Sequence, residues 1–252
     1  MADWNPEKYL LFKKQRTQPA IDLANRVRGC TPKKIVDIGC GPGNSTAVLR
    51  EVFPEAEIRG IDSSASMIER ARAKHGDLDF SLCSAEELDG TYDLLFSNAC
   101  LQWIPNHGVL IPHLMEKLTD GGALAVQMPM NREEPLYQII RTVAAESKWD
   151  FQKVCFETND TLAPEEYFNI LSDCSGSFEQ WETVYYHVLP SHEHLIDWVR
   201  ETRLRPYLAV LNDAQKQLFE GEILARVRAA YRPTSSGEVI LKFRRFFFVA
   251  CR

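Results

Sequence analysis

A glycine-rich loop placed directly after a short apolar run constrains the fold of this chain more than any other feature. The apolar run covers residues 34–38, and glycine follows at positions 39, 41 and 43. Glycine has no Cβ, so such a loop can turn tightly and let a ligand approach its main chain. Residues 44–53 then have helical character. A buried strand, a glycine loop and a helix in this order are typical of nucleotide-binding α/β folds.

Strand-like and helix-like segments continue to alternate along the first half of the chain. Short β-rich apolar runs predict strands, and longer amphipathic runs predict helices. We expect strands at 58–62, 79–83, 92–97 and 123–127, and helices at 64–75 and 107–118. Such alternation builds βαβ units with right-handed crossovers. The sequence therefore predicts an α/β fold with a doubly wound, mostly parallel seven-stranded sheet of the Rossmann-like type.

The second half departs from this rhythm. We expect a helix at 164–173, a strand at 180–189, helices at 192–201 and 213–231, and a β-rich closing segment at 238–251. Helices within about 190–232 would then be inserted before the last strand. Because ligands of such sheets bind beyond the carboxyl ends of the strands, we expect these helices to cap the site. Residues 1–252 are expected to form a single domain.

The spacing of the glycines distinguishes between two cofactors. A dinucleotide-binding loop needs glycine at 39, 41 and 44, and position 44 is asparagine here. The G-x-G-x-G form instead suits the methionine part of S-adenosylmethionine, which has no phosphate to hold. Asp62 stands nineteen residues after Gly43, where an acid can accept both ribose hydroxyls. We therefore predict S-adenosylmethionine, with a nicotinamide dehydrogenase and a purely structural glycine turn as alternatives.

Charge and composition narrow the class of partner. The formal net charge of −6 disfavours nucleic acid, whose binding depends on Lys and Arg neutralising phosphates. Residues 190–252 nevertheless carry 11 Lys and Arg against 7 Asp and Glu, which fits either a solvated helix face or a place for a small acidic substrate. We see no membrane span, no signal peptide and no metal or disulfide pattern in seven irregularly spaced cysteines. We expect a cytoplasmic protein without a membrane partner.

Several segments together resemble the trans-aconitate methyltransferases over nearly the full length of the chain. The glycine loop alone is typical of the whole superfamily, whereas the later segments are specific to this family. They are Asp3–Pro6 with Tyr9 and Arg16, Gly39–Ser45, Gly60–Ser64, Leu101–His107, Ala125–Pro129, Tyr185–His187, Ser191–His192, Asp197–Val199 and Leu204–Tyr207.

This resemblance implies a class I methyltransferase that transfers a methyl group from S-adenosylmethionine to a small tricarboxylic acid, giving a monomethyl ester. It also implies that residues 1–30 form a lid over the cofactor. The cofactor residues expected on this basis are Tyr9, Arg16, Gly39, Cys40, Gly41, Gly43, Asn44, Asp62, Ser63, Met67, Ser84, Ala85, Asn98, Ala99 and Gln102. Ser84, Met130 and Arg203 depart from the residues usual in the family.

A carboxylate substrate decides which residues the reaction needs. Because a carboxyl group is already ionised at neutral pH, its attack on a sulfonium methyl requires no general base. We therefore expect no catalytic proton acceptor and no metal. Positioning falls to arginines, which grip carboxylates with two hydrogen bonds. The candidates are Arg203, Arg205 and Arg245, also Arg244, with Tyr185, Tyr186 and His187 as donors and Trp103 as a wall of the methyl pocket.

Four alternatives remain open at this point. Any single arginine can equally form a surface ion pair, and Trp103 can equally be a core residue. The protein can bind the cofactor without turnover. It can also methylate a different carboxylic acid or a carrier-bound acyl chain.

Overall fold

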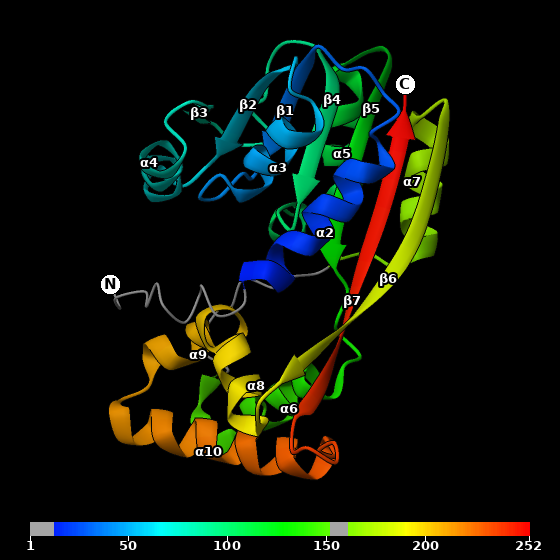
Figure 1. The fold of residues 1–252 in the computed structure, drawn as a ribbon. Coiled ribbons are helices and arrows are strands. Elements are labelled where there is room, and N and C mark those ends of the chain that lie inside the picture. Colours follow the sequence, from blue (N-terminus) through cyan, green and yellow to red (C-terminus); the bar gives the residue numbers. More distant parts are fainter. Residues whose placement is uncertain (1–12, 152–160) are drawn as a thin grey trace. The chain divides into compact units, whose positions relative to one another are not determined.

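The chain forms one seven-stranded sheet in the order β3-β2-β1-β4-β5-β7-β6 (Figure 1). The computed structural model describes residues 13–151 and 161–252, with the backbone alone for 13–16 and 201. The strands are β1 Lys34–Ile38, β2 Glu57–Asp62, β3 Asp79–Leu82, β4 Tyr92–Asn98, β5 Leu118–Pro129, β6 Ser177–Leu189 and β7 Val239–Cys251. Strands β1 to β5 pair in parallel, and β7 runs antiparallel to β5.

Two compact units divide the chain. The first, here called the sheet unit, comprises the described residues 14–129, 161–183 and 245–252. The second, the helical unit, comprises the described residues 130–151 and 184–244. Strands β6 and β7 pass from one unit to the other. The single-domain organisation, the lid and the closure of the cap stay predictions.

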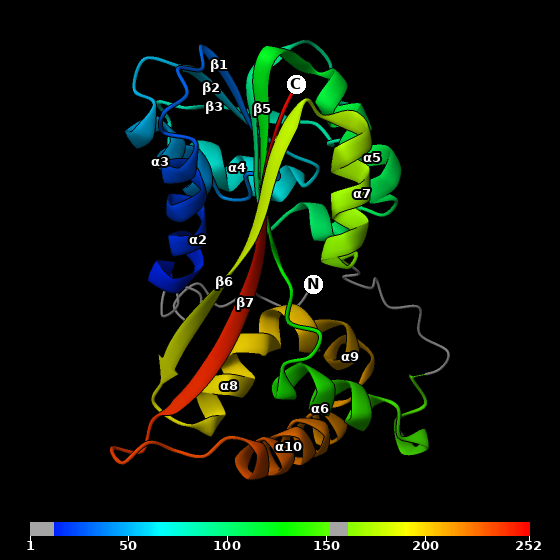
Figure 2. The same cartoon turned by 90° about the vertical axis from the view of Figure 1, so that its right-hand side faces the viewer.

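Helices cover both faces of the sheet unit, as a doubly wound sheet requires. Figure 2 shows α2, α3 and α4 on one face and α5 and α7 on the other. Because both faces are covered, β1 and β4 are buried at successive rather than alternate residues, and Leu94, Leu95 and Phe96 are fully buried. The five helices are α2 Lys13–Arg26, α3 Asn44–Val52, α4 Ala65–Lys74, α5 His107–Glu116 and α7 Pro164–Cys174.

The helical unit has an apolar core of its own. Phe219, Ile223 and Val227 repeat at four-residue spacing along α10 and are fully buried. Burial of each such side chain contributes roughly 1.5–3 kcal/mol. Helix α10 also begins with a capping box, in which Asn212 and Gln215 each accept the other's backbone N–H at 3.0 Å. The unit contains α6 Pro135–Ala144, α8 His192–Val199, a π-helix Arg200–Leu204, α9 Arg205–Val210 and α10 Asp213–Ala230.

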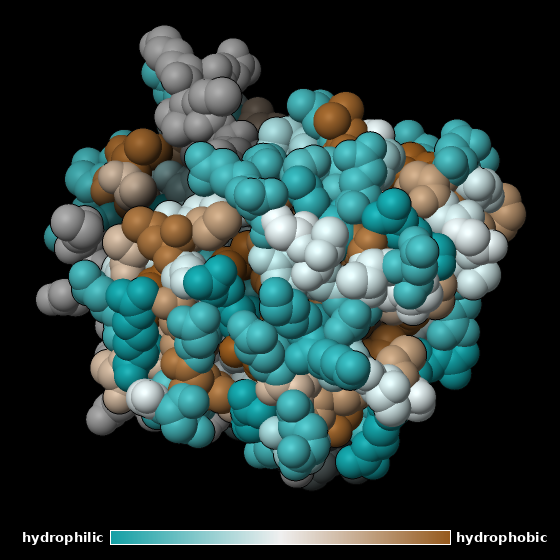
Figure 3. Space-filling model, turned by 90° about the horizontal axis from the view of Figure 1, so that it is seen from above, coloured by the Kyte–Doolittle hydropathy of each residue, from teal (hydrophilic) through white to brown (hydrophobic). Residues whose placement is uncertain are grey.

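The fold predicted from sequence is confirmed in class and in topology. Helices α8, α9 and α10 stand between β6 and β7, as the expected insertion before the last strand requires. Three described α-helices, α2, α6 and α9, were not predicted. None of the helices in residues 13–151 and 161–252 is both long and apolar enough to cross a membrane. Hydrophilic residues predominate on the face shown in Figure 3.

Candidate active site

The glycine loop joins β1 to α3 in a left-handed backbone conformation. Gly39, Gly41 and Gly43 have φ values of 68°, 53° and 85°. A Cβ added at Gly39 would lie 2.1 Å from the Sγ of Cys100, and one at Gly43 would lie 2.9 Å from the ring of Phe80. The backbone N–H of Gly39 donates to the carbonyl of Ile61 at 2.8 Å. Glycine is required here both for the turn and for the space.

Asp62, the predicted ribose acceptor, is held against this loop at the end of β2. Its Oδ2 accepts the N–H of Gly41 at 2.9 Å, and its Oδ1 accepts the N–H of Ser64 at 2.8 Å. The second contact lies at the start of α4, so Asp62 also serves the helix terminus. A carboxylate has about four lone-pair sites. Both oxygens can therefore accept further hydrogen bonds from a ligand.

Asp37 is a buried acid next to the loop that the sequence analysis did not select. It is fully buried in β1, where its Oδ2 accepts the hydroxyls of Ser45 at 2.7 Å and Thr46 at 2.6 Å. Its Oδ1 has no hydrogen-bond partner among the described residues. Burial raises the pKa of the Asp37 carboxyl to about 6, against the lowering effect of the two hydroxyls. The sequence does contain an indication of this residue, because an acid inside an otherwise apolar strand stands two residues before the first glycine.

The end of β4 supplies further polar groups beside the loop. Ala99 has a left-handed φ of 55°, which costs a non-glycine residue about 1–3 kcal/mol. Gln102 is buried and its Nε2 donates to the carbonyl of Ala99 at 2.7 Å. The side-chain oxygens of Asn98 and Gln102 are buried without a hydrogen-bond partner among the described residues. β2, β1 and β4 are neighbouring strands. These groups therefore lie with Asp37 and Asp62 along the carboxyl ends of the strands, here called one edge of the sheet.

The remaining predicted cofactor residues differ in burial and in their hydrogen bonds. Cys40 and Ala85 are buried, whereas Ser63 is exposed. Met67 is half-buried on α4, Asn44 accepts a hydrogen bond from Lys74, and the hydroxyl of Ser84 donates to Glu87 at 3.2 Å. Tyr9 and the side chain of Arg16 lie outside the described part of the chain.

Two predicted substrate residues belong to the sheet unit. Arg245 is 6% exposed in β7, and its Nη1 donates to Oε1 of Gln127 at 3.3 Å. Trp103 lies in a 3-10 helix, Leu101–Trp103, and is 51% exposed. Trp103 is therefore not a core residue.

The three consecutive aromatic candidates on β6 are not brought together. Adjacent strand residues point to opposite faces, so Tyr185 and His187 share one face, with ring centroids 6.4 Å apart. His187 is buried against Trp198 at 4.7 Å. Tyr186 lies on the other face and is 62% exposed.

Arg203 and Arg205 likewise point apart. Residues two apart on a helix do not face each other, and these two lie on the continuous helical segment that joins the π-helix to α9. Arg203 is half-buried, whereas Arg205 is exposed.

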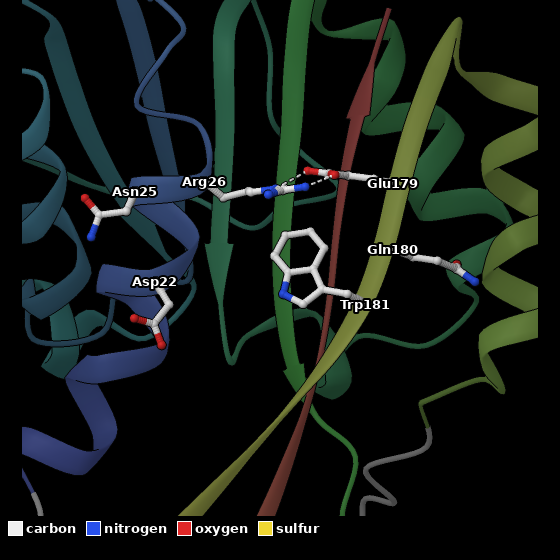
Figure 4. Close-up of a pocket in the computed structure, with 6 residues that line it drawn as sticks. All are labelled: Asp22, Asn25, Arg26, Glu179, Gln180 and Trp181. Atoms are coloured by element: carbon white, nitrogen blue, oxygen red, sulfur yellow. Dashed lines mark hydrogen bonds and ion pairs between the residues drawn. The ribbon is translucent and has the colours of Figure 1, made fainter.

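A cleft of about 490 Å³ lies elsewhere in the sheet unit, between α2 and β6 (Figure 4). Arg26 forms an ion pair with Glu179 and lies over the ring of Trp181 at 5.4 Å. Trp181 stacks on Phe247 with ring centroids 5.1 Å apart. These contacts fasten α2 to the edge strand, and none of the residues selected from sequence lines the cleft.

Comparison with known proteins defines the class of protein that has this fold and this arrangement of groups at the ends of the strands. Residues 32–191 match a family model described as a methyltransferase domain. The solved structure of YcgJ from Bacillus subtilis superposes with a TM-score of 0.59 at 12% identity, covering 93% of this chain and 98% of that one. A putative methyltransferase from Bacillus halodurans gives 0.57 at 11% identity, covering 92% and 97%. The protein is an S-adenosylmethionine-dependent methyltransferase.

Relatives in sequence narrow this further. Trans-aconitate 2-methyltransferase from Methylobacterium radiotolerans is 40% identical over 99% of this chain and 98% of its own length. The protein of the same name from Rhodopseudomonas palustris is 41% identical over the full length of both chains. The chain belongs to the trans-aconitate methyltransferase family. The predicted enzyme class and cofactor are thereby confirmed, and the dehydrogenase alternative is excluded.

The groups at this edge of the sheet fit S-adenosylmethionine. The cofactor presents an ammonium group and two ribose hydroxyls, all of them hydrogen-bond donors. The buried oxygens of Asp37, Asn98 and Gln102 that lack partners among the described residues are acceptors. The loop is open at Gly41, where an added Cβ would have no atom within 4 Å. Donors on the ligand thus correspond to acceptors on the protein.

Proposed function

We propose that this enzyme transfers the methyl group of S-adenosylmethionine to one carboxylate of trans-aconitate, forming a monomethyl ester. The observation that supports this most strongly is the extent of the identity with the named relatives. It covers 99–100% of the chain, whereas the general methyltransferase model ends at residue 191. The identity with the trans-aconitate enzymes therefore extends over the helices after residue 191, beyond the general methyltransferase model.

The chemistry assigns different tasks to different residues. The bound cofactor supplies an electrophilic methyl group on a sulfonium, and the carboxylate oxygen forms the new C–O bond as the C–S bond breaks. The glycine loop and Asp62 position the cofactor, with Asn98, Gln102 and Asp37 as acceptors; Ser84 and Ala85 flank the adenine. Arginine side chains, for which Arg203, Arg205 and Arg245 are the candidates, hold the carboxylates that do not react. Because the carboxylate nucleophile is already ionised, the rate of methyl transfer depends on orientation and on removal of water rather than on a base.

A panel of small acids tests this proposal. Purified enzyme is given S-adenosylmethionine and one of several di- and tricarboxylates, and release of S-adenosylhomocysteine is measured. We expect turnover with trans-aconitate to exceed turnover with cis-aconitate, isocitrate and citrate. Comparable or higher turnover with another acid would replace trans-aconitate in the proposal, and cofactor binding without any turnover would indicate a non-catalytic binding protein.

We propose further that the enzyme works in the cytoplasm, without nucleic-acid or membrane partners. The net charge of −6 and the odd number of irregularly spaced cysteines, seven in all, support this. Fractionation of cells that produce the protein is expected to recover it with cytoplasmic markers.

A further inference from the structure

A buried histidine, His107, connects α5 and α7 with the segment that follows β4. It is the first residue of α5 and is 3% exposed. Its Nδ1 lies 2.7 Å from the hydroxyl of Tyr167 on α7, and its Nε2 lies 2.8 Å from the carbonyl oxygen of Leu101. Helices α5 and α7 lie side by side on one face of the sheet (Figure 2). All three residues belong to the sheet unit.

The two contacts determine the tautomer of the imidazole ring. A carbonyl oxygen can only accept, so Nε2 carries the hydrogen that His107 donates to Leu101. In the neutral ring Nδ1 is then an acceptor, and the Tyr167 hydroxyl donates to it. That hydroxyl in turn accepts the backbone N–H of Leu162 at 3.2 Å. One directed chain of hydrogen bonds therefore runs from the segment before α7 to the carbonyl of Leu101.

This carbonyl lies in a segment that carries two side chains of the strand-end edge. Leu101 begins the 3-10 helix, and the next residue, Gln102, is buried with a side-chain oxygen that has no hydrogen-bond partner in the described part of the chain. The preceding residue, Cys100, lies directly beside Gly39, where an added Cβ would collide with its Sγ. A shift of Leu101 would therefore displace both Gln102 and the side chain that packs on the glycine loop.

The backbone of this segment is strained at both ends. Ala99 and Asn106, which flank residues 100–105, have left-handed φ values of 55° and 60°. Such a conformation is unfavourable for a residue with a Cβ and persists only where the surrounding structure enforces it. At the first end, the N–H of Ala99 donates to the carbonyl of Gln127 at 2.9 Å. At the second end, His107 directly follows Asn106 and ties the segment to α7.

We propose that His107, oriented by Tyr167, is a positioning residue for S-adenosylmethionine. Its hydrogen bond to Leu101 holds residues 99–106 in the strained conformation that places Cys100 and Gln102 beside the glycine loop. His107 acts through Leu101 and neither contacts the cofactor nor transfers a proton. The inference depends on the use of S-adenosylmethionine and not on the identity of the acid substrate.

Calorimetric titration with S-adenosylhomocysteine tests this role without any acid substrate. The amide nitrogen of a Gln side chain can replace Nε2, whereas the shorter Asn side chain reaches only as far as Nδ1. We expect His107→Asn to raise Kd about 5- to 50-fold, because only a fraction of the molecules then keeps the binding conformation. His107→Gln is expected to recover most of this loss. Tyr167→Phe, which removes the donor to Nδ1 and keeps the ring, is expected to raise Kd about 2- to 5-fold.

Tyr231→Phe is the matched control. It also removes a buried tyrosine hydroxyl, which donates to Glu134 at 2.7 Å and accepts the N–H of Leu136 at 3.0 Å. Tyr231 belongs to the helical unit and lies outside this chain of hydrogen bonds, so we expect Kd to stay within about twofold. Thermal unfolding shows which variants are folded, and Tyr167→Phe provides the test if His107→Asn does not fold.

NMR of the wild-type protein labelled with ¹⁵N in its histidines adds a measurement that does not depend on binding. We expect hydrogen on Nε2 of His107 and none on Nδ1, with the signals assigned by their absence from the spectrum of His107→Gln. The opposite tautomer would overturn the proposal. So would wild-type affinity in the folded His107→Asn and Tyr167→Phe variants, equal losses in the Asn and Gln variants, or an equal loss in Tyr231→Phe.

Discussion

At the residue scale, Gly39 and Gly41 have similar backbone conformations but different surroundings. Both have a positive φ. A Cβ at Gly39 would lie 2.1 Å from Cys100, whereas a Cβ at Gly41 would have no atom within 4 Å. The burial of Cys100 raises the pKa of its thiol to about 12, so this cysteine stays neutral and acts there through its volume.

This difference predicts unequal costs of substitution. Gly39→Ala is expected to lower the free energy of unfolding by about 2–4 kcal/mol, from the strained φ and the displaced Cys100 together. Gly41→Ala is expected to lose only about 1 kcal/mol, from the strained φ. Urea denaturation of the cofactor-free proteins measures both. Equal losses would show that contact with Cys100 does not determine the need for glycine at 39.

The buried Asp37 predicts how stability depends on pH. The folded-state pKa of about 6 lies above the value of about 3.9 expected in the unfolded chain. Between these values the folded state binds more protons, so Asp37 makes the protein less stable as pH rises from about 4 to about 6, and its effect is constant above that. Relative to Asp37→Asn, wild-type stability is expected to fall by about 3 kcal/mol over this range. Urea denaturation at several pH values measures the difference, and parallel profiles would contradict the raised pKa.

At the scale of the element, the sequence predicted what depends on local pattern and missed what depends on distant partners. Strands β1, β2 and β4, the loop and Asp62 follow from periodicity and spacing. Helix α2 escaped notice because it is mainly polar and contains Pro19. Helix α6 is short and was missed, although Leu136, Ile140 and Val143 recur at helical spacing and Pro135 stands at its start. The ion pair of Arg26 with Glu179 could not be foreseen, because it joins residues that are far apart in the sequence.

The capping box of α10 offers a test at this scale. Asn212→Ala removes the side chain that accepts the N–H of Gln215 and is expected to lower the free energy of unfolding by about 1 kcal/mol. Gln217→Ala, at an exposed position inside the same helix, is the matched control and is expected to lose nothing. Chemical denaturation compares the two. An equal effect at both positions would show that the cap contributes little.

At the scale of the whole molecule, not all the arginines of the basic segment 190–252 are available to bind an acid. The basic excess of residues 190–252 suggested either a solvated face or a place for an acid. Arg200, Arg226 and Arg228 are engaged in ion pairs, so only a subset of the arginines remains available for a substrate. We therefore expect substitutions in the glycine loop to raise KM for the cofactor. A substitution at Arg203, which forms no ion pair within the described part of the chain, is expected to raise KM for the acid.

Identification of the methylated product tests the central claim most directly. The enzyme is given trans-aconitate and S-adenosylmethionine labelled with ¹³C in its methyl group, and the product is examined by NMR and mass spectrometry. We expect one labelled methyl group, bonded to a carboxylate oxygen of aconitate, in an amount equal to the S-adenosylhomocysteine formed. A labelled methyl on carbon, or cofactor consumed without any labelled ester, would contradict the account.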